Sequence, residues 1–93
     1  MTAMDIIKQF VEGSISPKDF EEKVYADLAV ETLLKGESNL PAYVPEPDLY
    51  TYAISQDYRN LECIYNLQTL LSGVLNKNGV THTVEKNTST CST

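Results

Sequence analysis

The sequence predicts a single small all-α domain, a bundle of about five helices with a proline-rich linker and a flexible C-terminal tail. Its apolar residues recur at helical spacing, and capping residues bound each run. With 93 residues the chain can bury only roughly 60 to 65% of its unfolded surface, which allows one core. A hydrophobic content of 42% is enough to fill that core. We expect residues 1–79 to form the domain and residues 80–93 to form an extended or disordered tail.

Three helices are predicted in the first part of the chain. The first spans about residues 3–12 and ends at Gly13, because glycine readily adopts the left-handed conformation that closes many helices. The second begins at Pro17, directly after a capping serine, and the third follows Asp27 and ends at Gly36. The side chains expected to point inward are Ile6, Ile7, Phe10, Val11, Phe20, Val24, Tyr25, Leu28, Val30, Leu33 and Leu34.

Two more helices follow the linker. Residues 37–47 hold three of the four prolines, so they form neither regular helix nor central strand. A fourth helix is predicted from residue 48 to about residue 58. Asn60 caps the fifth, which shows the strongest helical periodicity and ends at Gly79. Its inward set is Ile64, Leu67, Leu70, Leu71, Val74 and Leu75.

The C-terminal segment has a different pattern. Residues 80–84 alternate β-branched and polar side chains, but one strand without a partner does not make a sheet. Residues 86–93 are rich in serine and threonine and contain little to bury, so we expect them to be loose in solution.

The net charge of −6 argues against binding to nucleic acid or to anionic lipid, because both repel an acidic surface. No stretch approaches the roughly 20 apolar residues of a membrane span, and the N-terminus has no signal-peptide pattern. The two cysteines, Cys63 and Cys91, predict neither a disulfide framework nor a metal site. A cytoplasmic location is therefore expected.

The residues that catalysis usually requires are sparse. His82 is the only histidine and is expected to be exposed and unengaged, so no histidine-based zinc set can form. The four glycines are scattered, which excludes phosphate-binding loops, and Gly73 is expected to permit a close helix crossing. The adjacent Glu21 and Glu22 are expected to be ordinary surface groups. We expect no enzymatic activity, no cofactor and no metal site.

Acidic residues and tyrosines are concentrated in the middle of the chain. Between Asp19 and Glu62 there are ten acidic and three basic residues, and five of the six tyrosines lie between Tyr43 and Tyr65. Tyrosine provides a large contact area with a polar tip and is enriched in protein interfaces. Some of these rings could instead fill the core, since the chain has no tryptophan and two phenylalanines. The predicted partner-binding residues are Glu46, Asp48, Tyr50, Asp57, Tyr58 and Glu62.

Four segments resemble small bacterial immunity proteins, which are the antitoxins of contact-dependent growth inhibition and related polymorphic toxin systems. They are Met-Asp-Ile-Ile-Lys-Gln-Phe-Val-Glu-Gly-x-Ile-Ser at 4–16, Asp-Phe-Glu-Glu-Lys-Val-Tyr at 19–25, Asn-Leu-Pro-x-Tyr at 39–43 and Asp-Leu-Tyr-x-Tyr at 48–52. The likeness extends over roughly residues 4–75, although members of that group tend to be longer at the C-terminus. The resemblance implies cytoplasmic residence, no enzymatic activity and tight binding to one cognate toxin domain, commonly a nuclease. An acidic, tyrosine-bearing face would then cover the toxin's basic active-site cleft.

Two other functions and two other docking places stay open at this point. A non-catalytic helical adaptor or regulatory subunit would have the same composition, and so would a nucleic-acid mimic that inhibits several DNA-binding enzymes. A partner could also dock on the predicted second helix around Glu21 and Glu22, or against residues 80–84 as an added strand.

Overall fold

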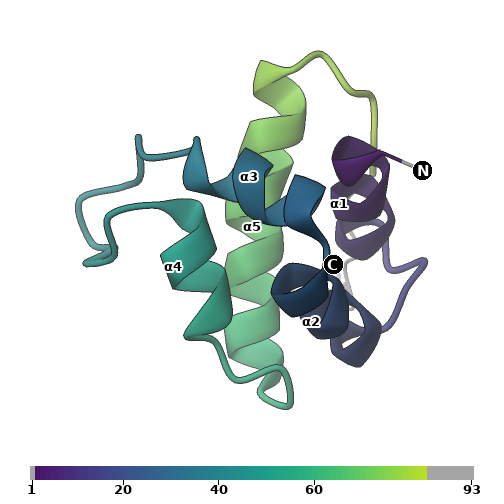
Figure 1. Ribbon diagram of the computed structural model, residues 1–93, viewed down its shortest axis with the longest axis horizontal. Coiled ribbons are helices and arrows are strands. Elements are labelled where there is room, and N and C mark those ends of the chain that lie inside the picture. The colour runs from purple at the N-terminus through teal and green to yellow at the C-terminus, as the bar shows by residue number, and fades with distance from the viewer. Residues whose placement is uncertain (1, 84–93) are drawn as a thin grey trace, which may run out of the picture.

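The computed structural model describes residues 2–83 and contains five helices and no strand in that range (Figure 1). The helices are α1 (Ala3–Val11), α2 (Pro17–Ala26), α3 (Leu28–Lys35), α4 (Leu49–Ile54) and α5 (Leu61–Lys77). The predicted all-α class and the number of helices are confirmed. The expected loose segment at residues 86–93 lies outside the described residues.

Helix α5 is the longest element and runs through the middle of the molecule (Figure 1). Helix α1 packs along it, and α3 contacts both α1 and α4. Helix α2 lies against α1, α3 and α4. Helix α1 is thus the main neighbour of α5, while the short helices pack mostly on one another, and each short helix buries apolar side chains in a shared core.

Polar side chains begin every helix. The N-caps are Thr2, Ser16, Asp27, Asp48 and Asn60, and each accepts a hydrogen bond from a backbone N–H in the first turn. Such caps satisfy N–H groups that have no partner within the helix. The predicted starts of the second to fifth helices at these capping signals are confirmed.

Glycines close two of the helical segments in the way the sequence indicates. Gly13 and Gly79 have φ values of 79° and 72°, in the left-handed region that glycine occupies without strain. Gly36 also ends a helix, but its φ of −77° is right-handed. The chain leaves α3 there through a tight turn, in which the Gly36 N–H donates to the carbonyls of Thr32 and Leu33.

Helix α4 is shorter than predicted, because it ends at Ile54 and not near residue 58. The Tyr52 carbonyl accepts hydrogen bonds from the Ser55 hydroxyl at 2.8 Å and from the Gln56 side-chain amide at 3.1 Å. Polar side chains that bond to nearby backbone in this way compete with helix continuation. The chain then turns through residues 55–60 and enters α5.

The core agrees with most of the predicted inward set. Phe10 and Phe20 are the largest of the 11 large side chains that are fully buried. Their rings stack with centroids 4.0 Å apart. Leu33 and Leu70 are partly buried at its edge. Two expectations are wrong, since Tyr25 is 59% exposed and Leu28 is 73% exposed. Leu28 is the first residue of α3, where the chain has just turned away from α2 at the surface.

One buried polar contact joins the first and last helices. Gln68 is buried, and its side-chain amide donates to the carbonyl oxygen of Phe10 at 2.9 Å. That carbonyl lies in the last turn of α1 and also accepts from the Gly13 N–H at 3.1 Å. The contact fixes α1 against the middle of α5.

Residues 80–83 follow α5 as an extended segment without strand pairing, and they contact the helices. Val80 packs against the core, and its N–H donates to the Leu75 carbonyl at 2.9 Å. The N–H of Thr83 donates to a Glu12 carboxylate oxygen at 3.2 Å. These contacts hold residues 80–83 across the ends of α5 and α1.

Replacing Leu67 with alanine is expected to lower the free energy of unfolding by about 2 to 5 kcal/mol, because Leu67 is fully buried and its removal leaves a cavity. Chemical denaturation measures the change. The matched control is Leu61→Ala on the same helix, where the leucine is 75% exposed and the same truncation should cost much less. Equal losses for the two variants would contradict this assignment of the core.

The Glu12 carboxylate provides a pH prediction. The hydrogen bond from the Thr83 N–H, together with that from Lys8, lowers the pKa of Glu12 below its ordinary 4.5. Because the pKa of Glu12 is lower in the folded state, the contact stabilises the fold at pH values above the ordinary pKa of 4.5. This stabilisation is lost as the pH falls through the lowered pKa of the folded state. In an NMR titration, the Thr83 amide shift should change with the same midpoint as the Glu12 carboxyl, below 4.5. In Glu12→Gln the Thr83 amide should show no transition there, and a midpoint at or above 4.5 in the wild type would refute the contact.

Candidate partner-binding surface

The structure divides the six predicted partner-binding residues into two groups. Glu46, Asp48 and Tyr50 lie where the linker enters α4, and Asp57, Tyr58 and Glu62 lie around the turn from α4 to α5. The side chains of the first group mostly contact other residues of the same chain. The second contains the exposed carboxylates.

Asp48 is the N-cap of α4. Its carboxylate accepts from the backbone N–H of Thr51 at 2.8 Å and from the Thr51 hydroxyl at 3.0 Å. Both contacts are partly buried, and the side chain therefore has a structural role that the sequence analysis did not separate from binding.

A lysine lies within the first group and reduces its negative charge. Lys35 of α3 donates to Glu31 at 2.6 Å, and its Nζ lies 5.1 Å from the centre of the Tyr50 ring. The hydrogen bond to Glu31 is the main reason why the pKa of Lys35 is raised, and the charge of Asp48 adds to it. This part of the predicted face is closer to neutral than the acid count along the chain indicates.

Glu46 is directed toward its own chain. One carboxylate oxygen accepts from the Ser55 hydroxyl at 3.5 Å. The other oxygen, Oε1, is buried and has no hydrogen-bond partner among residues 2–83. A partner would have to displace this side chain before both oxygens could be used.

Tyr58 contradicts the expectation of an exposed contact residue, since it is 7% exposed. Its hydroxyl donates to the Ala53 carbonyl at 2.8 Å, and its ring centre lies 6.4 Å from that of Phe20. Burial raises the pKa of Tyr58 well above its ordinary value. The physical reason is the early end of α4, which turns the chain so that residue 58 lies under α2.

The other tyrosines divide between core and surface. Tyr52 is buried in the core, while Tyr65 is 49% exposed and Tyr43 is 76% exposed. Tyr25, outside the acidic stretch, lies on the surface, and its hydroxyl donates to the Ile54 carbonyl at 2.9 Å. Which tyrosines are buried and which are exposed could not be predicted from their positions along the chain alone.

Asp57 and Glu62 are exposed, as a contact role requires. Asp57 accepts from the Arg59 backbone N–H at 3.0 Å, and the Arg59 Nε lies 3.7 Å away. Asp57 also lines a cavity of about 530 Å³ together with Glu21 of α2. Two docking places that are separate in the sequence, the second helix and the acidic stretch, therefore meet at one surface.

An apolar groove continues this surface onto the first turns of α5. Leu61 and Tyr65 are 75% and 49% exposed, and four residues apart they lie on the same side of the helix. Ile15 and Pro17 form the opposite wall of the groove, whose volume is about 310 Å³. Leu61 was not among the predicted contacts, although its spacing of four residues from Tyr65 was an available signal.

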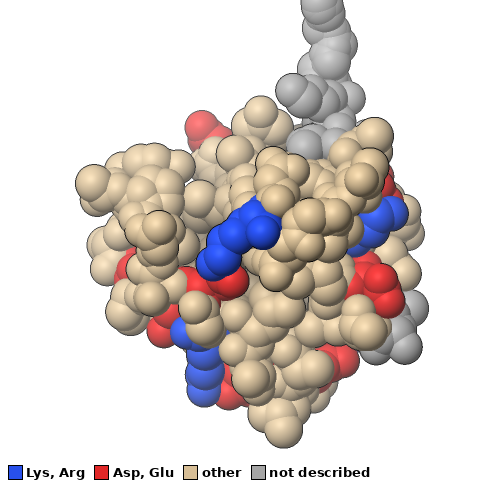
Figure 2. Space-filling model, turned by 90° about the horizontal axis from the view of Figure 1, so that it is seen from above, with Lys and Arg blue, Asp and Glu red and all other residues tan. Residues whose placement is uncertain are grey.

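We refer to the carboxylates and apolar side chains exposed in this region as the α2–α5 surface. It consists of the half-buried Glu21 and the exposed Asp57, Leu61, Glu62 and Tyr65. Two basic residues, Lys18 and Arg59, line the same cavity as Glu21 and Asp57. A different face, seen from above in Figure 2, shows acidic and basic side chains interspersed among uncharged ones. The excess of acids in the sequence does not give a uniformly negative surface there.

His82 is partly buried and not free in solution as expected. Its Nε2 lies 2.7 Å from the Ser72 hydroxyl, and its Nδ1 lies 2.9 Å from the Val80 carbonyl. Since the carbonyl can only accept, Nδ1 carries a proton, and in the neutral ring Nε2 then accepts from Ser72. Residues 80–83 are thus attached to α5, and this part of the chain is not a free strand; Val84 lies outside the described residues.

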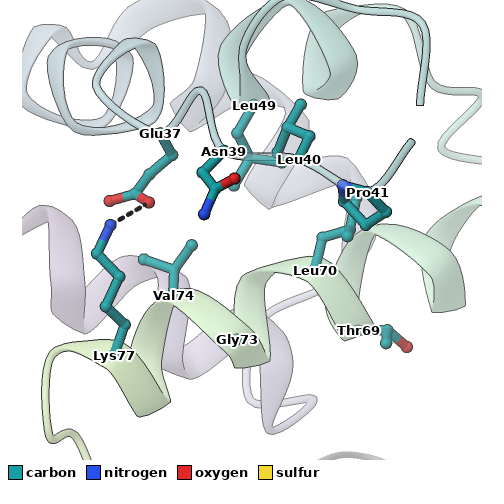
Figure 3. Close-up of a pocket in the computed structure, with 10 residues that line it drawn as sticks. All are labelled: Glu37, Asn39, Leu40, Pro41, Leu49, Thr69, Leu70, Gly73, Val74 and Lys77. Carbon is teal, nitrogen blue, oxygen red and sulfur yellow. Dashed lines mark hydrogen bonds and ion pairs between the residues drawn. The ribbon is translucent and has the colours of Figure 1, made fainter. Parts of the chain in front are cut away.

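Gly73 does not mark a close helix crossing. A Cβ atom added there would find nothing within 4 Å, so the helix faces open space at this position. The explanation proposed from the sequence is wrong, because the linker passes α5 at a distance and leaves a cavity (Figure 3).

Within residues 2–83 no group of three or more histidine, cysteine, aspartate or glutamate side chains could hold a metal ion. Cys63 is a free thiol and is half-buried, as expected for a packing residue. None of the helices in the described part of the chain is long and apolar enough to span a membrane.

Comparison of the chain with models of protein families, with curated proteins and with solved structures finds no significant match.

Replacing Tyr58 with phenylalanine is expected to lower the free energy of unfolding by about 1 kcal/mol, because the ring stays and the hydrogen bond to Ala53 is lost. Thermal or chemical denaturation measures this. The control, Tyr65→Phe, removes a hydroxyl from an exposed ring and should change the stability very little. A Tyr58→Phe variant as stable as the wild type would show that the hydroxyl contributes nothing to the turn.

Proposed function

We propose that this chain is an immunity protein that binds a cognate bacterial toxin domain and neutralises it by covering a basic active-site cleft. The observation that supports the proposal is the α2–α5 surface, where two exposed apolar side chains lie near three carboxylates, which outnumber the two basic residues, Lys18 and Arg59, beside them. The resemblance of residues 4–75 to small immunity proteins is the second support. The toxin domain would be a nuclease, whose substrate requires a basic cleft.

The composition of the α2–α5 surface suits a protein partner. Leu61 and Tyr65 expose apolar surface that would be buried and lose its water on binding, as the central residues of interfaces commonly do. Asp57 and Glu62 are positioned as charged groups around them and would meet lysines and arginines of the toxin. Opposite charges accelerate association, which benefits an inhibitor that must act before the toxin does.

The remaining predicted contacts have lesser roles in this proposal. Tyr58 supports the turn that presents Asp57, through its hydrogen bond to Ala53. Asp48 and Tyr50 lie near Lys35, whose charge partly offsets that of Asp48, and Glu46 is bonded to Ser55 of its own chain. The protein would act in the cytoplasm and without an activity or cofactor of its own.

The first experiment identifies the partner. The tagged protein is used as bait in an extract of the source strain at moderate salt, and retained proteins are identified by mass spectrometry. A retained protein is then purified and assayed for nuclease activity with and without this chain, and the two are co-expressed. Abolished nuclease activity and restored growth would support the proposal. Retention of an unrelated basic protein, or inhibition of several DNA-binding enzymes, would favour an adaptor or a nucleic-acid mimic and would overturn it.

The charges of the α2–α5 surface give a quantitative prediction. The double variant Asp57→Asn/Glu62→Gln should associate several-fold more slowly with the purified toxin domain, and its association rate should depend less on salt. Stopped-flow fluorescence over a range of ionic strength measures both.

The matched control is Asp27→Asn/Glu31→Gln, which removes the same charge from the start of α3. Asparagine also serves as an N-cap, so the fold is preserved. If the two double variants slowed association equally, net charge and not the α2–α5 surface would determine the encounter. An unchanged rate in the first variant would place the toxin elsewhere.

A further inference from the structure

A cavity of about 260 Å³ lies between the linker that follows α3 and the C-terminal half of α5 (Figure 3). Its walls are aliphatic: Leu40 and Pro41 come from the linker, and Leu70 and Val74 come from α5. The space above Gly73 is open, because a Cβ at that position would have no neighbour within 4 Å. We call this space the linker cavity; it is separate from the α2–α5 surface on the first turns of α5.

The charged groups at one end of the linker cavity neutralise each other. Lys77 donates to a Glu37 carboxylate oxygen at 2.9 Å, and both side chains line the cavity. A neutral pair does not attract a phosphate or a metal ion. It can still offer donors and an acceptor to a ligand that is itself uncharged.

Asn39 adds a polar group in the middle of the cavity. Figure 3 shows its amide directed from the linker toward α5, with no hydrogen bond or ion pair joining it to the other residues drawn. An asparagine amide carries donors and an acceptor side by side. A peptide group, with one N–H and one C=O, is the complementary ligand.

The size of the linker cavity limits the range of possible ligands further. Sites for drug-sized molecules usually measure about 300 to 1,000 Å³, so this cavity is small for such a ligand. It exceeds the roughly 150 Å³ that hold a benzene molecule, so its aliphatic walls can take one leucine, isoleucine, valine or methionine side chain with room for the adjoining peptide group.

The linker wall is formed before any ligand binds. The Glu37 carbonyl accepts from the Leu49 N–H at 2.9 Å, and the Pro41 carbonyl accepts from the Val44 N–H at 3.0 Å. Val44 is buried, and the proline rings restrict the backbone between these contacts. A preformed site loses little conformational entropy on binding.

From these observations we propose that the linker cavity binds one aliphatic side chain of an extended peptide segment of a protein partner, with the Asn39 amide paired to the peptide group beside it. The inference rests on the proposed function only in taking the partner to be a protein. It specifies a second contact of different chemistry from the acidic one.

Gly73 allows the cavity to be filled without disturbing its walls. In Gly73→Phe the ring should occupy the linker cavity, whereas Gly73→Ala adds one methyl group in open space and should leave the cavity free. Asn39→Ala removes the amide from an exposed position. Circular dichroism and thermal unfolding establish whether each variant is folded. If Gly73→Phe does not fold, Asn39→Ala still tests the proposal.

The probe is a displayed library of random peptides, selected on the wild-type protein with counter-selection on Gly73→Phe. We expect the enriched peptides to share one aliphatic residue. Synthetic copies should bind wild type and Gly73→Ala alike. They should bind Gly73→Phe about tenfold to a hundredfold more weakly, the range expected for losing one buried aliphatic side chain. They should bind Asn39→Ala about twofold to tenfold more weakly, the range expected for losing a hydrogen bond. The methyl groups of Leu40, Leu70 and Val74 should shift in NMR spectra on binding.

The inference is overturned if no aliphatic peptide is enriched, or if the enriched peptides bind Gly73→Phe and Asn39→Ala as well as they bind the wild type. It is equally overturned if they lose affinity for Asp57→Asn/Glu62→Gln instead, which would place them on the α2–α5 surface. If the wild type self-associates and Gly73→Phe does not, the occupant of the linker cavity is a second copy of this chain. That result would also overturn the inference. Because the assay contains no toxin, its failure leaves the proposed function standing, and failure of the toxin experiment leaves this result standing.

Discussion

The structure depends most on Phe10, where three helices are joined by two kinds of interaction. Its ring stacks on Phe20 of α2 with centroids 4.0 Å apart, and its carbonyl accepts the amide of Gln68 from α5 at 2.9 Å. The ring contact buries apolar area, and the hydrogen bond gives the buried Gln68 amide a partner at the end of α1. Tyr58 extends the same cluster to the α4–α5 turn through its contact with Phe20. The position of the exposed acids on that turn is therefore a consequence of core packing.

Acidic residues serve several purposes in this chain, and their number overstates the charge available to a partner. Asp27 and Asp48 cap helices, while Glu31 and Glu37 pair with lysines. These groups are still charged, but their fields are partly cancelled by helix dipoles or by the neighbouring cation. Asp57 also has a cation nearby, since the Arg59 Nε lies 3.7 Å away, but both side chains of that pair are exposed. Asp57 and Glu62 therefore keep the exposure that an encounter with a basic partner needs.

Helix α5 connects the two proposed contacts. Its first turns present Leu61 and Tyr65 beside the carboxylates, and its C-terminal half forms one wall of the linker cavity. A single straight helix places both regions on one rigid element, so a partner that used both would meet a preorganised arrangement. The acidic contact would affect mainly the rate of association, and the aliphatic one mainly the rate of dissociation.

The sequence by itself determined the helical class, the number of helices, most of their starts and most of the core, because capping and apolar periodicity are local properties. It also identified Asp57 and Glu62 as exposed carboxylates. Only the tertiary structure decided that Tyr58 is buried, that α4 stops at Ile54, that Gln68 pairs with Phe10 and that Gly73 faces a cavity. Each of these depends on which segments distant in the chain come together. Burial and pairing are set by the neighbours that folding supplies, and a residue's own type and local pattern do not specify those neighbours.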